Sequence, residues 1–430
     1  MKRKLLGILS ARVNWGNLLF LSAWFWWSAA PAHAEMHAGV AKVDITPQQP
    51  CVLAGYAGRT SLSTGVHDPL SARAVAFEEG GKRLVLVSSD LIGYYTTVDY
   101  MRSAILDACK LEPEELVLTA IHTHAAPKAS LEAENTHPNN VEYTKTVSAQ
   151  LVKLVQQALA GLKPARIGVG IGASPVGINR RETVIDKNGQ KQIRLGRNPS
   201  GSTDKDVQVL QIREQSGEKP LAMLFAYATH GTSLGSKNLV VSGDVLGLAA
   251  QFVEQHLGDG IIAPVFAGAS GDIDPWFRVL PEIKTGNGWI PESVLLGTML
   301  GEEVVQTSGK ILEFTEAGPI HSIIKTIELP AKTNPTATLP MTITVARIGN
   351  VAFAGLGGEV FHEIGRAIKK ASPFPHTFII THCNGRAGYL VVKEAYPEGG
   401  YEVKTTHFAP EAAEIVLQEV TLLLKQLADH

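Results

Sequence analysis

The segment 83–122 carries the pattern that most restricts how this 430-residue chain can fold. Residues 83–91 (RLVLVSSDL) form a short apolar run of the kind that makes a buried strand, and residues 96–109 have the apolar spacing of an amphipathic helix. A second apolar run, residues 116–121 (LVLTAI), ends at His122. A strand, a helix and a strand in this order build a βαβ unit, in which the two strands lie parallel in one sheet. The segment therefore predicts an α/β fold.

The rest of the chain continues to mix strands and helices. We expect further strands near 166–171, 207–213, 220–228, 261–267 and 377–381, with a hairpin inside 342–354. We expect further helices at 140–162, 246–257, 359–371 and 410–427. The polar stretch 181–206 is expected to be a long loop or a hairpin, either a lid or binding segment or a plain surface hairpin. No linker-like composition interrupts residues 35–430, so we expect one α/β domain with mixed (α+β) sheets.

The first 34 residues have the features of a secretory signal peptide. Basic residues at 2–4 precede an apolar run at 18–30, and Ala32-His33-Ala34 offers a small-x-small cleavage site. The apolar run is shorter than the ~20 residues that a membrane span needs, which makes a membrane anchor the less favoured alternative. We therefore expect residues 1–34 to be a signal peptide and the mature protein to be exported to the periplasm or secreted.

Composition excludes some classes of function. Lys and Arg number 39 and Asp and Glu 41, so the formal charge is −2 and no nucleic-acid partner is indicated. Hydrophobic residues make up 45 %, enough to bury a sizeable core. The three cysteines, Cys51, Cys109 and Cys383, leave at least one thiol unpaired, and an exported chain could form one disulfide of unspecified pairing.

Two of the expected strands run directly into histidines. The strand at 116–121 is followed by His122-Thr123-His124, and the strand at 220–228 by Thr229-His230. Open α/β sheets bind ligands outside the carboxyl ends of their strands, and residues two apart on an extended chain share a face. Imidazole is a common zinc ligand and also transfers protons near neutral pH. Each motif alone is more typical of ordinary structural histidines than of metal ligands.

Two further segments place carboxylates at such positions. In Gly271-Asp272-Ile273-Asp274-Pro275 the aspartates could orient a ligand or act as bases, although glycine and proline also favour a plain turn. Glu359 follows two glycines at the expected start of a helix, where it could be a capping residue stabilised by the helix dipole. As a ligand it would instead complete a His/His/Glu zinc set with His122 and His230.

Together these segments resemble the neutral (non-lysosomal) ceramidase family. The resemblance begins at residues 39–47 (GVAKVDITP) and continues through 65–74 (GVHDPLSARA) and 87–90 (VSSD). It includes 123–127 (THAAP), where the family has Thr-His-Ser-Gly-Pro after its first zinc histidine. It extends to the segments 178–180 and 228–230 and to Asn384, Tyr389, Tyr396, Tyr401 and Glu402, which keep the family's spacing. About residues 38–425 are covered.

The resemblance implies a site and a domain organisation. One Zn²⁺ would be held by His122, His230, Glu359 and Tyr389. His124 would be a general acid/base, while Arg180 and Tyr401 would contact the substrate or polarise its carbonyl. Residues 35–430 would form the family's catalytic domain, and we expect no counterpart of the C-terminal β-sandwich domain of its full-length enzymes.

One position departs from the family. The family's Gly-Asp-Val-Ser-Pro segment carries a serine thought to be central to catalysis, whereas this chain has Asp274 at that place. Ser270 lies four residues earlier and does not align with it. Its Gly-x-Ser-Gly context is a weak match to a nucleophile elbow, so a serine hydrolase is a minor alternative.

These residues predict a zinc-dependent hydrolase that cleaves an amide bond in an N-acyl lipid or a related N-acyl substrate. We expect attack by zinc-activated water, with Asp274 as general base and His124 protonating the leaving amine. N-acyl lipids, N-acyl amino acids and peptidoglycan-type amides all fit, and transient contact with a membrane surface is compatible with a lipid substrate. The alternatives are a hydrolase of a non-lipid amide and a non-catalytic protein that binds zinc and a lipid. The oligomeric state is open.

We predict that signal peptidase cleaves after Ala34, because a short apolar core precedes a small-x-small motif there. N-terminal sequencing of the exported protein should then begin at Glu35. An intact Met1 on membrane-bound protein would identify a membrane anchor instead.

Overall fold

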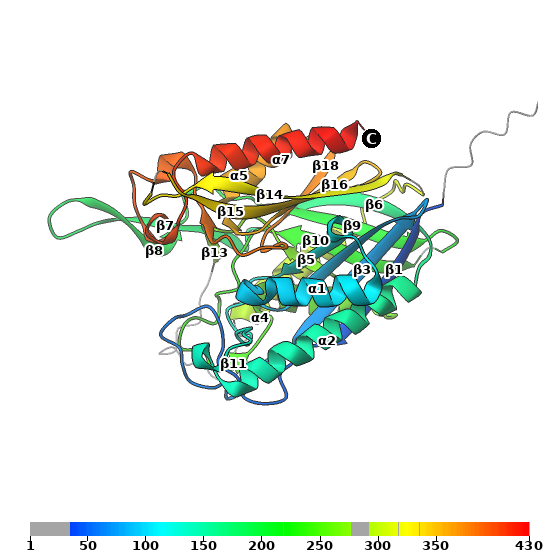
Figure 1. Ribbon diagram of the computed structural model, residues 1–430, viewed down its shortest axis with the longest axis horizontal. Coiled ribbons are helices and arrows are strands. Elements are labelled where there is room, and N and C mark those ends of the chain that lie inside the picture. The colour runs from blue at the N-terminus through cyan, green and yellow to red at the C-terminus, as the bar shows by residue number, and fades with distance from the viewer. Residues whose placement is uncertain (1–34, 218, 277–291, 317, 335, 430) are drawn as a thin grey trace, which may run out of the picture. The chain divides into compact units, whose positions relative to one another are not determined.

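The fold is built around two stacked β-sheets, each covered on its outer face by helices (Figure 1). The computed structural model describes residues 35–217, 219–276, 292–316, 318–334 and 336–429. The expected signal peptide, residues 1–34, lies outside the described residues. No helix of the described ranges is both long enough and apolar enough to cross a membrane. This mixed α/β architecture confirms the expected fold class.

The larger sheet has eight strands in the order β12-β10-β9-β6-β1-β3-β4-β5. Their bounds are β1 His37–Asp44, β3 Ser71–Glu79, β4 Lys82–Ser89, β5 Leu116–Ala120, β6 Lys163–Ala173, β9 Asp206–Glu214, β10 Pro220–Tyr227 and β12 Val265–Ala267. Strands β4 and β5 pair in parallel and are joined through helix α1 (Val98–Cys109), so the predicted βαβ unit is confirmed. Strands β1 and β3, which pattern analysis missed, pair antiparallel along their whole length.

The second sheet has four strands in the order β14-β15-β16-β18. Their bounds are β14 Ile320–Pro330, β15 Thr338–Ile348, β16 Val351–Leu356 and β18 His376–Ile380, which confirms the hairpin predicted inside 342–354 and the strand near 377–381. The core between the two sheets includes Phe77 and Leu224 from the first sheet and Phe353 and Phe378 from the second. Each of these side chains is almost fully buried, and each contributes about 1.5–3 kcal/mol of transfer free energy.

Helices form the outer layers. Helices α1 and α2 (Pro138–Ala160) cover the free face of the eight-stranded sheet, and α5 (His362–Ala371) and α7 (Ala412–Ala428) cover the four-stranded sheet (Figure 1). Helices α3 (Asp244–Leu257) and α4 (Glu292–Ser308) pack together against β9, β10 and β12. Between them, a Cβ added at Gly297 would lie 2.6 Å from Leu248 Cβ, so this close packing requires glycine.

Short strands carry the residues of most interest. The stretch 181–206 contains much of a hairpin, β7 (Gly177–Ile185) with β8 (Lys191–Asn198), and β7 also pairs with β13 (Ile273–Pro275). Strands β2 (Gly65–Val66) and β11 (Val240–Val241) form another small pair. Strands β17 (Glu359–Val360) and β19 (Tyr389–Leu390) pair in parallel.

The expected helix at 359–371 begins three residues later than predicted. Glu359 belongs to β17, and helix α5 starts at His362. The backbone N–H of Glu359 donates to Gly388 O at 2.8 Å, and its neighbour Val360 accepts from Gly271 N at 2.8 Å. Strand pairing with distant segments therefore replaces the helix-capping role that was one reading of Glu359.

Distant strand ends meet at one place. The Ser88 hydroxyl of β4 donates to Val265 O of β12, so the edge strand β12 approaches the strand next to the opposite edge, β5, of the same sheet. Beyond the end of β18, Thr381 N donates to Ala267 O at the end of β12, and Asn384 N donates to Leu118 O of β5. The segment that follows β18 is thereby bonded to both β12 and β5.

A buried ion network fixes part of this arrangement. Arg73 of β3 is fully buried and pairs with Asp90, which follows β4, and with Glu254 on α3. A buried charge that loses its partner is strongly destabilising, so the three segments are bound to one relative position. All three cysteines of the described chain are unpaired, and the optional disulfide is not formed.

Candidate functional site

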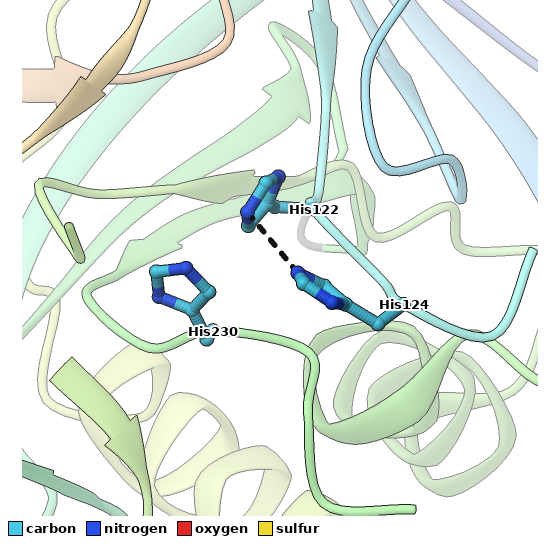
Figure 2. A group of neighbouring side chains, drawn as sticks. All are labelled: His122, His124 and His230. Carbon is cyan, nitrogen blue, oxygen red and sulfur yellow. Dashed lines mark hydrogen bonds between the residues drawn. The ribbon is translucent and has the colours of Figure 1, made fainter. Parts of the chain in front are cut away.

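Three histidines from two separate segments lie close together (Figure 2). His122 and His124 follow β5, and His230 follows β10. The two segments are bridged by backbone hydrogen bonds, from His124 N to Gly231 O at 2.8 Å and from Gly231 N to His122 O at 3.2 Å. His122 has a left-handed backbone, with φ of 63°, so the pair is not a simple extension of the strand. Uncommon conformations of this kind cluster at functional sites.

The backbone contacts of two of these imidazoles fix where their lone pairs point. His122 Nδ1 lies 2.7 Å from Ile92 O, and His230 Nδ1 lies 2.6 Å from Ser270 O. Because a carbonyl oxygen only accepts hydrogen bonds, each Nδ1 carries a proton and donates it. The Nε2 atom of each ring is therefore an acceptor directed into the site.

A carboxylate oxygen meets the same two acceptors. Glu359 Oε2 lies 3.4 Å from His122 Nε2 and 3.3 Å from His230 Nε2. Burial alone raises the pKa of Glu359, but the imidazoles of His122 and His230 outweigh it and hold the pKa well below its usual range. Three lone-pair donors so close together require a proton or a cation between them.

The donor set fits zinc. Zinc binds imidazole nitrogen and carboxylate oxygen at about 2.0–2.2 Å in tetrahedral geometry, which puts neighbouring ligand atoms about 3.3 Å apart. The two measured separations from Glu359 Oε2 have this size. The backbone carbonyls that hold the two Nδ1–H groups are the usual outer partners of metal-binding histidines.

Tyr389 is brought to the same place by strand pairing. It is the direct partner of Glu359 in the β17–β19 pair, and only 9 % of it is exposed. Its hydroxyl accepts a hydrogen bond of 2.9 Å from Arg180 Nη2. Burial, followed by the charge of Glu359, raises the pKa of Tyr389 well above its ordinary value. The residue that the family resemblance proposed as fourth ligand is thus adjacent to the third.

Arg180 is the centre of a buried network on the side of His230. Its Nε donates to Glu402 Oε1 at 2.8 Å, and its Nη1 lies 3.1 Å from His230 Nε2 and 3.2 Å from Asp274 Oδ1. Its guanidinium also lies over the rings of Tyr389 and Tyr401, 5.6 and 5.9 Å from their centroids. Glu402 is fully buried and also accepts from Arg181, so its position is fixed and Arg180 is held rigidly.

Asp274 lies behind the histidines. It is 1 % exposed, and its Oδ1 accepts from Arg180 and from the hydroxyl of Thr232 at 3.3 Å. Among the described residues it is not part of the cavity wall in front of the site. Ser270 is also buried, and its carbonyl accepts from His230 Nδ1. Ser270 therefore positions His230 directly, and Asp274 contacts it only through Arg180.

His124 has the environment of a proton-transfer group. Its Nε2 lies 3.3 Å from His122 Nε2, and its buried Nδ1 has no hydrogen-bond partner in the described structure. Neither nitrogen is bonded to a backbone carbonyl, so the backbone does not fix either one as a donor. Burial, followed by the nearby His122, lowers the pKa of His124 well below its ordinary value and keeps the ring neutral. A side chain at Gly55, where φ is 98°, would put a Cβ 2.3 Å from Nδ1, so glycine is needed there.

A cavity of about 550 Å³ opens in front of these residues. His122, His124, Glu359, Tyr389 and Tyr401 all contribute to its wall. The rest of the wall is a mixture of apolar, aromatic and charged side chains: Val52, Leu53, Ala54, Gly55, Tyr56, Ala57, Arg59, Thr60, Ile92, Tyr95, Lys128, Glu134 and Thr136. The volume is in the range of small-molecule sites.

A second cluster supports the loop behind His230. His362 Nδ1 lies 2.7 Å from Asp272 Oδ2, and His362 Nε2 lies 2.8 Å from the Ser202 hydroxyl. Asp272 also accepts from His362 N at 2.9 Å and from Asn179 Nδ2 at 3.2 Å. Asp272 is thus fully engaged, and it fixes the segment whose carbonyls, at Ser270 and Ile273, accept from His230 Nδ1.

Sequence reasoning missed one histidine at the site. His382 stacks on His122, with ring centroids 3.8 Å apart and planes 12° apart. A signal was present, because Thr381-His382 follows β18 as Thr229-His230 follows β10. Asn384, noted only for its spacing, has a φ of 53°, accepts from Leu118 N at 2.9 Å and donates to Leu116 O at 2.9 Å.

Comparison with protein families gives one match. The family model described as neutral/alkaline non-lysosomal ceramidase, N-terminal, matches residues 36–276. Among curated proteins, neutral ceramidase 1 of Arabidopsis thaliana is 27 % identical over 237 residues, which are 52 % of this chain and 29 % of that protein. Neutral ceramidase of Mycobacterium tuberculosis is 28 % identical over 238 residues, 50 % of this chain and 35 % of that protein. The matched segment thus spans about a third of these relatives.

Solved structures extend the similarity over nearly the whole chain. The crystal structure of neutral ceramidase from Pseudomonas aeruginosa superposes with a TM-score of 0.76 at 20 % sequence identity. The superposition covers 92 % of this chain and 75 % of that one. A second structure, described as ceramidase complexed with C2, gives a TM-score of 0.75 at 19 % identity. These likenesses show a shared fold.

We predict that the chelator-treated protein loses stability as the pH falls from about 6.5 toward 4. Burial, followed by the nearby Arg180, lowers the pKa of His230 from 6.5 to about 4 in the folded chain. Below pH 6.5 the unfolded chain therefore takes up a proton that the folded chain does not. The contribution of His230 to the unfolding free energy is fully present above pH 6.5, and it falls by roughly 3 kcal/mol as the pH drops to about 4. Urea unfolding at about pH 7.5 and pH 5 measures the difference.

The variant His230→Asn should show a smaller fall between the two pH values. His256→Asn, an exposed position on α3, is the control and should keep the wild-type difference. Equal pH dependence in wild type and His230→Asn would contradict the assignment of this window to His230.

Proposed function

The chain belongs to the neutral/alkaline non-lysosomal ceramidase family, and we propose from this that it is a zinc-dependent hydrolase of an amide bond in an N-acyl substrate. One observation carries the proposal. Glu359 Oε2 lies within 3.4 Å of two imidazole acceptors, His122 Nε2 and His230 Nε2, and both His122 and Glu359 line a cavity of about 550 Å³. A neutral imidazole that can exchange protons, His124, lines the same cavity.

His122, His230 and Glu359 would hold the zinc ion, with Tyr389 as the fourth ligand. A bound zinc ion supplies Lewis-acid chemistry, polarising the substrate carbonyl and lowering the pKa of water. The pairing of Tyr389 with Glu359 in adjacent strands supports the fourth position. Because the hydroxyl of Tyr389 accepts from Arg180, the arginine also favours its deprotonated form.

His124 would move the proton that amide cleavage requires. An amine is a poor leaving group until its nitrogen is protonated, and a positioned imidazole typically contributes 10²–10⁴-fold to such a step. The neutral ring of His124 can take a proton at one nitrogen and release it from the other, because neither is committed to a backbone acceptor. Tyr401, on the cavity wall and 44 % exposed, would contact the substrate.

Arg180 would orient the site rather than titrate. Glu402, Asp274 and Tyr389 hold three sides of its guanidinium. Burial alone lowers the pKa of Arg180, but the nearby Tyr389 and Glu402 outweigh burial and raise the pKa, so the charge of Arg180 is permanent. A fixed positive group beside His230 and Tyr389 stabilises negative charge at the site without reorganisation.

The contacts of Asp274 support a positioning role. The sequence predicted a general base, but Asp274 is buried behind the cavity wall and its Oδ1 is bound by Arg180 and Thr232. We propose that Asp274 orients Arg180, which in turn contacts His230 and Tyr389. The base hypothesis makes a different prediction and can be separated from this one.

The purified protein should contain one zinc per chain and hydrolyse members of a fluorogenic N-acyl amide panel. A chelator should abolish turnover, and added zinc should restore it. His230→Ala should lose zinc and activity because it removes a ligand at the centre of the donor set. Elemental analysis and initial rates measure both, with His256→Ala as the exposed control.

Full zinc retention in His230→Ala would remove this ligand assignment. Zinc binding without turnover of any acyl amide would favour a non-catalytic binding protein. Thermal unfolding should be followed in parallel, because metal loss can also unfold a domain.

Asp274→Asn should keep zinc and lose less than about 10-fold in kcat, because the amide oxygen still accepts from Arg180. Asp274→Ala leaves a buried cation without one of its acceptors and should lose about 10- to 100-fold. A base would behave differently, since Asn and Ala would both cost about 10²–10⁴-fold. Steady-state kinetics and zinc content of the two variants distinguish the roles.

A further inference from the structure

Arg59 is a buried cation in the wall of the catalytic cavity. Only 7 % of it is exposed. Its Nη2 donates to the backbone carbonyls of Ala54 and His124, and its Nη1 donates to Asn238 O at 3.0 Å. Its Nε is buried and has no hydrogen-bond partner among the described residues. The guanidinium therefore has unused N–H groups as well as an unneutralised charge.

No carboxylate of the described chain forms an ion pair with Arg59. Burial lowers its pKa, and the only charge interaction that opposes this comes from Tyr56. The other buried arginines near the site are neutralised, Arg180 by Glu402 and Asp274, and Arg181 by Glu398 and Glu402. A buried charge without a counter-ion is costly, and an anionic ligand would provide the missing partner.

The surrounding groups place this charge on the side of His124. Arg59 is bonded to the His124 carbonyl, and its guanidinium lies 5.0 Å from the ring centroid of Tyr56. The Tyr56 ring is in turn 5.1 Å from the His124 ring. If His124 protonates the leaving amine, the amine portion of the substrate is the part that lies near Arg59.

We propose that Arg59 selects N-acyl amides whose amine portion carries a carboxylate, that is, N-acyl amino acids. This inference rests on the proposed hydrolase function and names its substrate class. The apolar wall residues Val52, Leu53 and Ile92 provide a surface for the acyl chain. Hydrolysis of such a substrate consumes one water: the carbonyl carbon gains the hydroxyl, the C–N bond breaks, the nitrogen gains the proton, and a fatty acid and an amino acid are released.

Charge makes this selection asymmetric. A neutral amine portion would displace water from the neighbourhood of Arg59 without replacing its interactions, whereas a carboxylate would accept charge-assisted hydrogen bonds. Sites built to bind a polar group reject analogues that lack it more strongly than apolar pockets reject a change of size. A zinc ion in the same cavity would add further positive charge and strengthen the preference.

The test compares two substrates that differ only in charge, N-dodecanoylglycine and its neutral analogue N-dodecanoylglycinamide. The wild-type enzyme should favour the carboxylate roughly 10- to 100-fold in kcat/KM, the range of one charged hydrogen bond. Arg59→Gln should lose most of this preference, because its kcat/KM for the carboxylate substrate falls while its kcat/KM for the amide changes little. Arg59→Lys should keep part of it. Zinc content and thermal unfolding confirm that each variant is folded.

Arg347→Gln is the matched control. Arg347 is partly buried, also donates to backbone carbonyls, those of Gly349 and Leu427, and also lies over an aromatic ring, that of Phe374, but it is not part of the cavity wall. The variant should lose stability as Arg59→Gln does, yet keep the wild-type preference for the carboxylate.

Three outcomes would overturn the inference. The first is a wild type that hydrolyses the neutral amide, or ceramide, as well as N-dodecanoylglycine, and this leaves the hydrolase function in place. The second is an equal loss on both substrates in Arg59→Gln, which makes Arg59 structural. The third is no hydrolysis of any acyl amide by zinc-loaded enzyme, which overturns the proposed function as well. Calorimetric titration with N-dodecanoylglycine separates the last case further, because an anion site alone would bind it in wild type and not in Arg59→Gln.

Discussion

The hydrogen bonds that join β5, the end of β12 and the segment after β18 are the constraint on which the site depends. Asn384 is the central residue: its backbone and side chain bind Leu116 and Leu118 of β5, and its side chain also binds Thr344 and Arg102. Such a buried polar cluster is stable only when its members are satisfied together, so it admits one arrangement of the two sheets. The positions of His122, His230 and Glu359 follow from that arrangement.

Two kinds of buried positive charge lie around the site, and they have different consequences. Arg180 is paired with the carboxylates of Glu402 and Asp274, and it also contacts Tyr389 and His230. Among the described residues, Arg59 has only backbone carbonyls as acceptors and keeps an unpaired Nε. A buried charge that is paired with counter-ions stabilises the fold, whereas a buried charge without a counter-ion in a cavity wall can be paired by a ligand of opposite charge.

Asp274, where the family resemblance leads us to expect a serine, fits this picture. In the structure the aspartate contacts Arg180 and Thr232, behind the histidines. A carboxylate binds a guanidinium there more strongly than a serine hydroxyl would. The proposed zinc-ligand set does not include this position. The family relationship and the possible substrate are thus separate questions, the first decided by motifs shared along the chain and the second by the cavity wall.

Local patterns in the sequence were sufficient for many of the elements: the βαβ unit, the hairpin of β15 and β16, and the helices α2, α3 and α7. Apolar periodicity and helix-ending residues depend on neighbours in sequence, which is why they could be read. The motifs also identified His122, His230 and Glu359 as candidates. Only the tertiary structure decided that Glu359 lies in a strand beside Tyr389, that His382 stacks on His122, and that the buried Nε of Arg59 has no partner among the described residues. Those facts arise from contacts between residues far apart in sequence, and the energy of such contacts has no local signature.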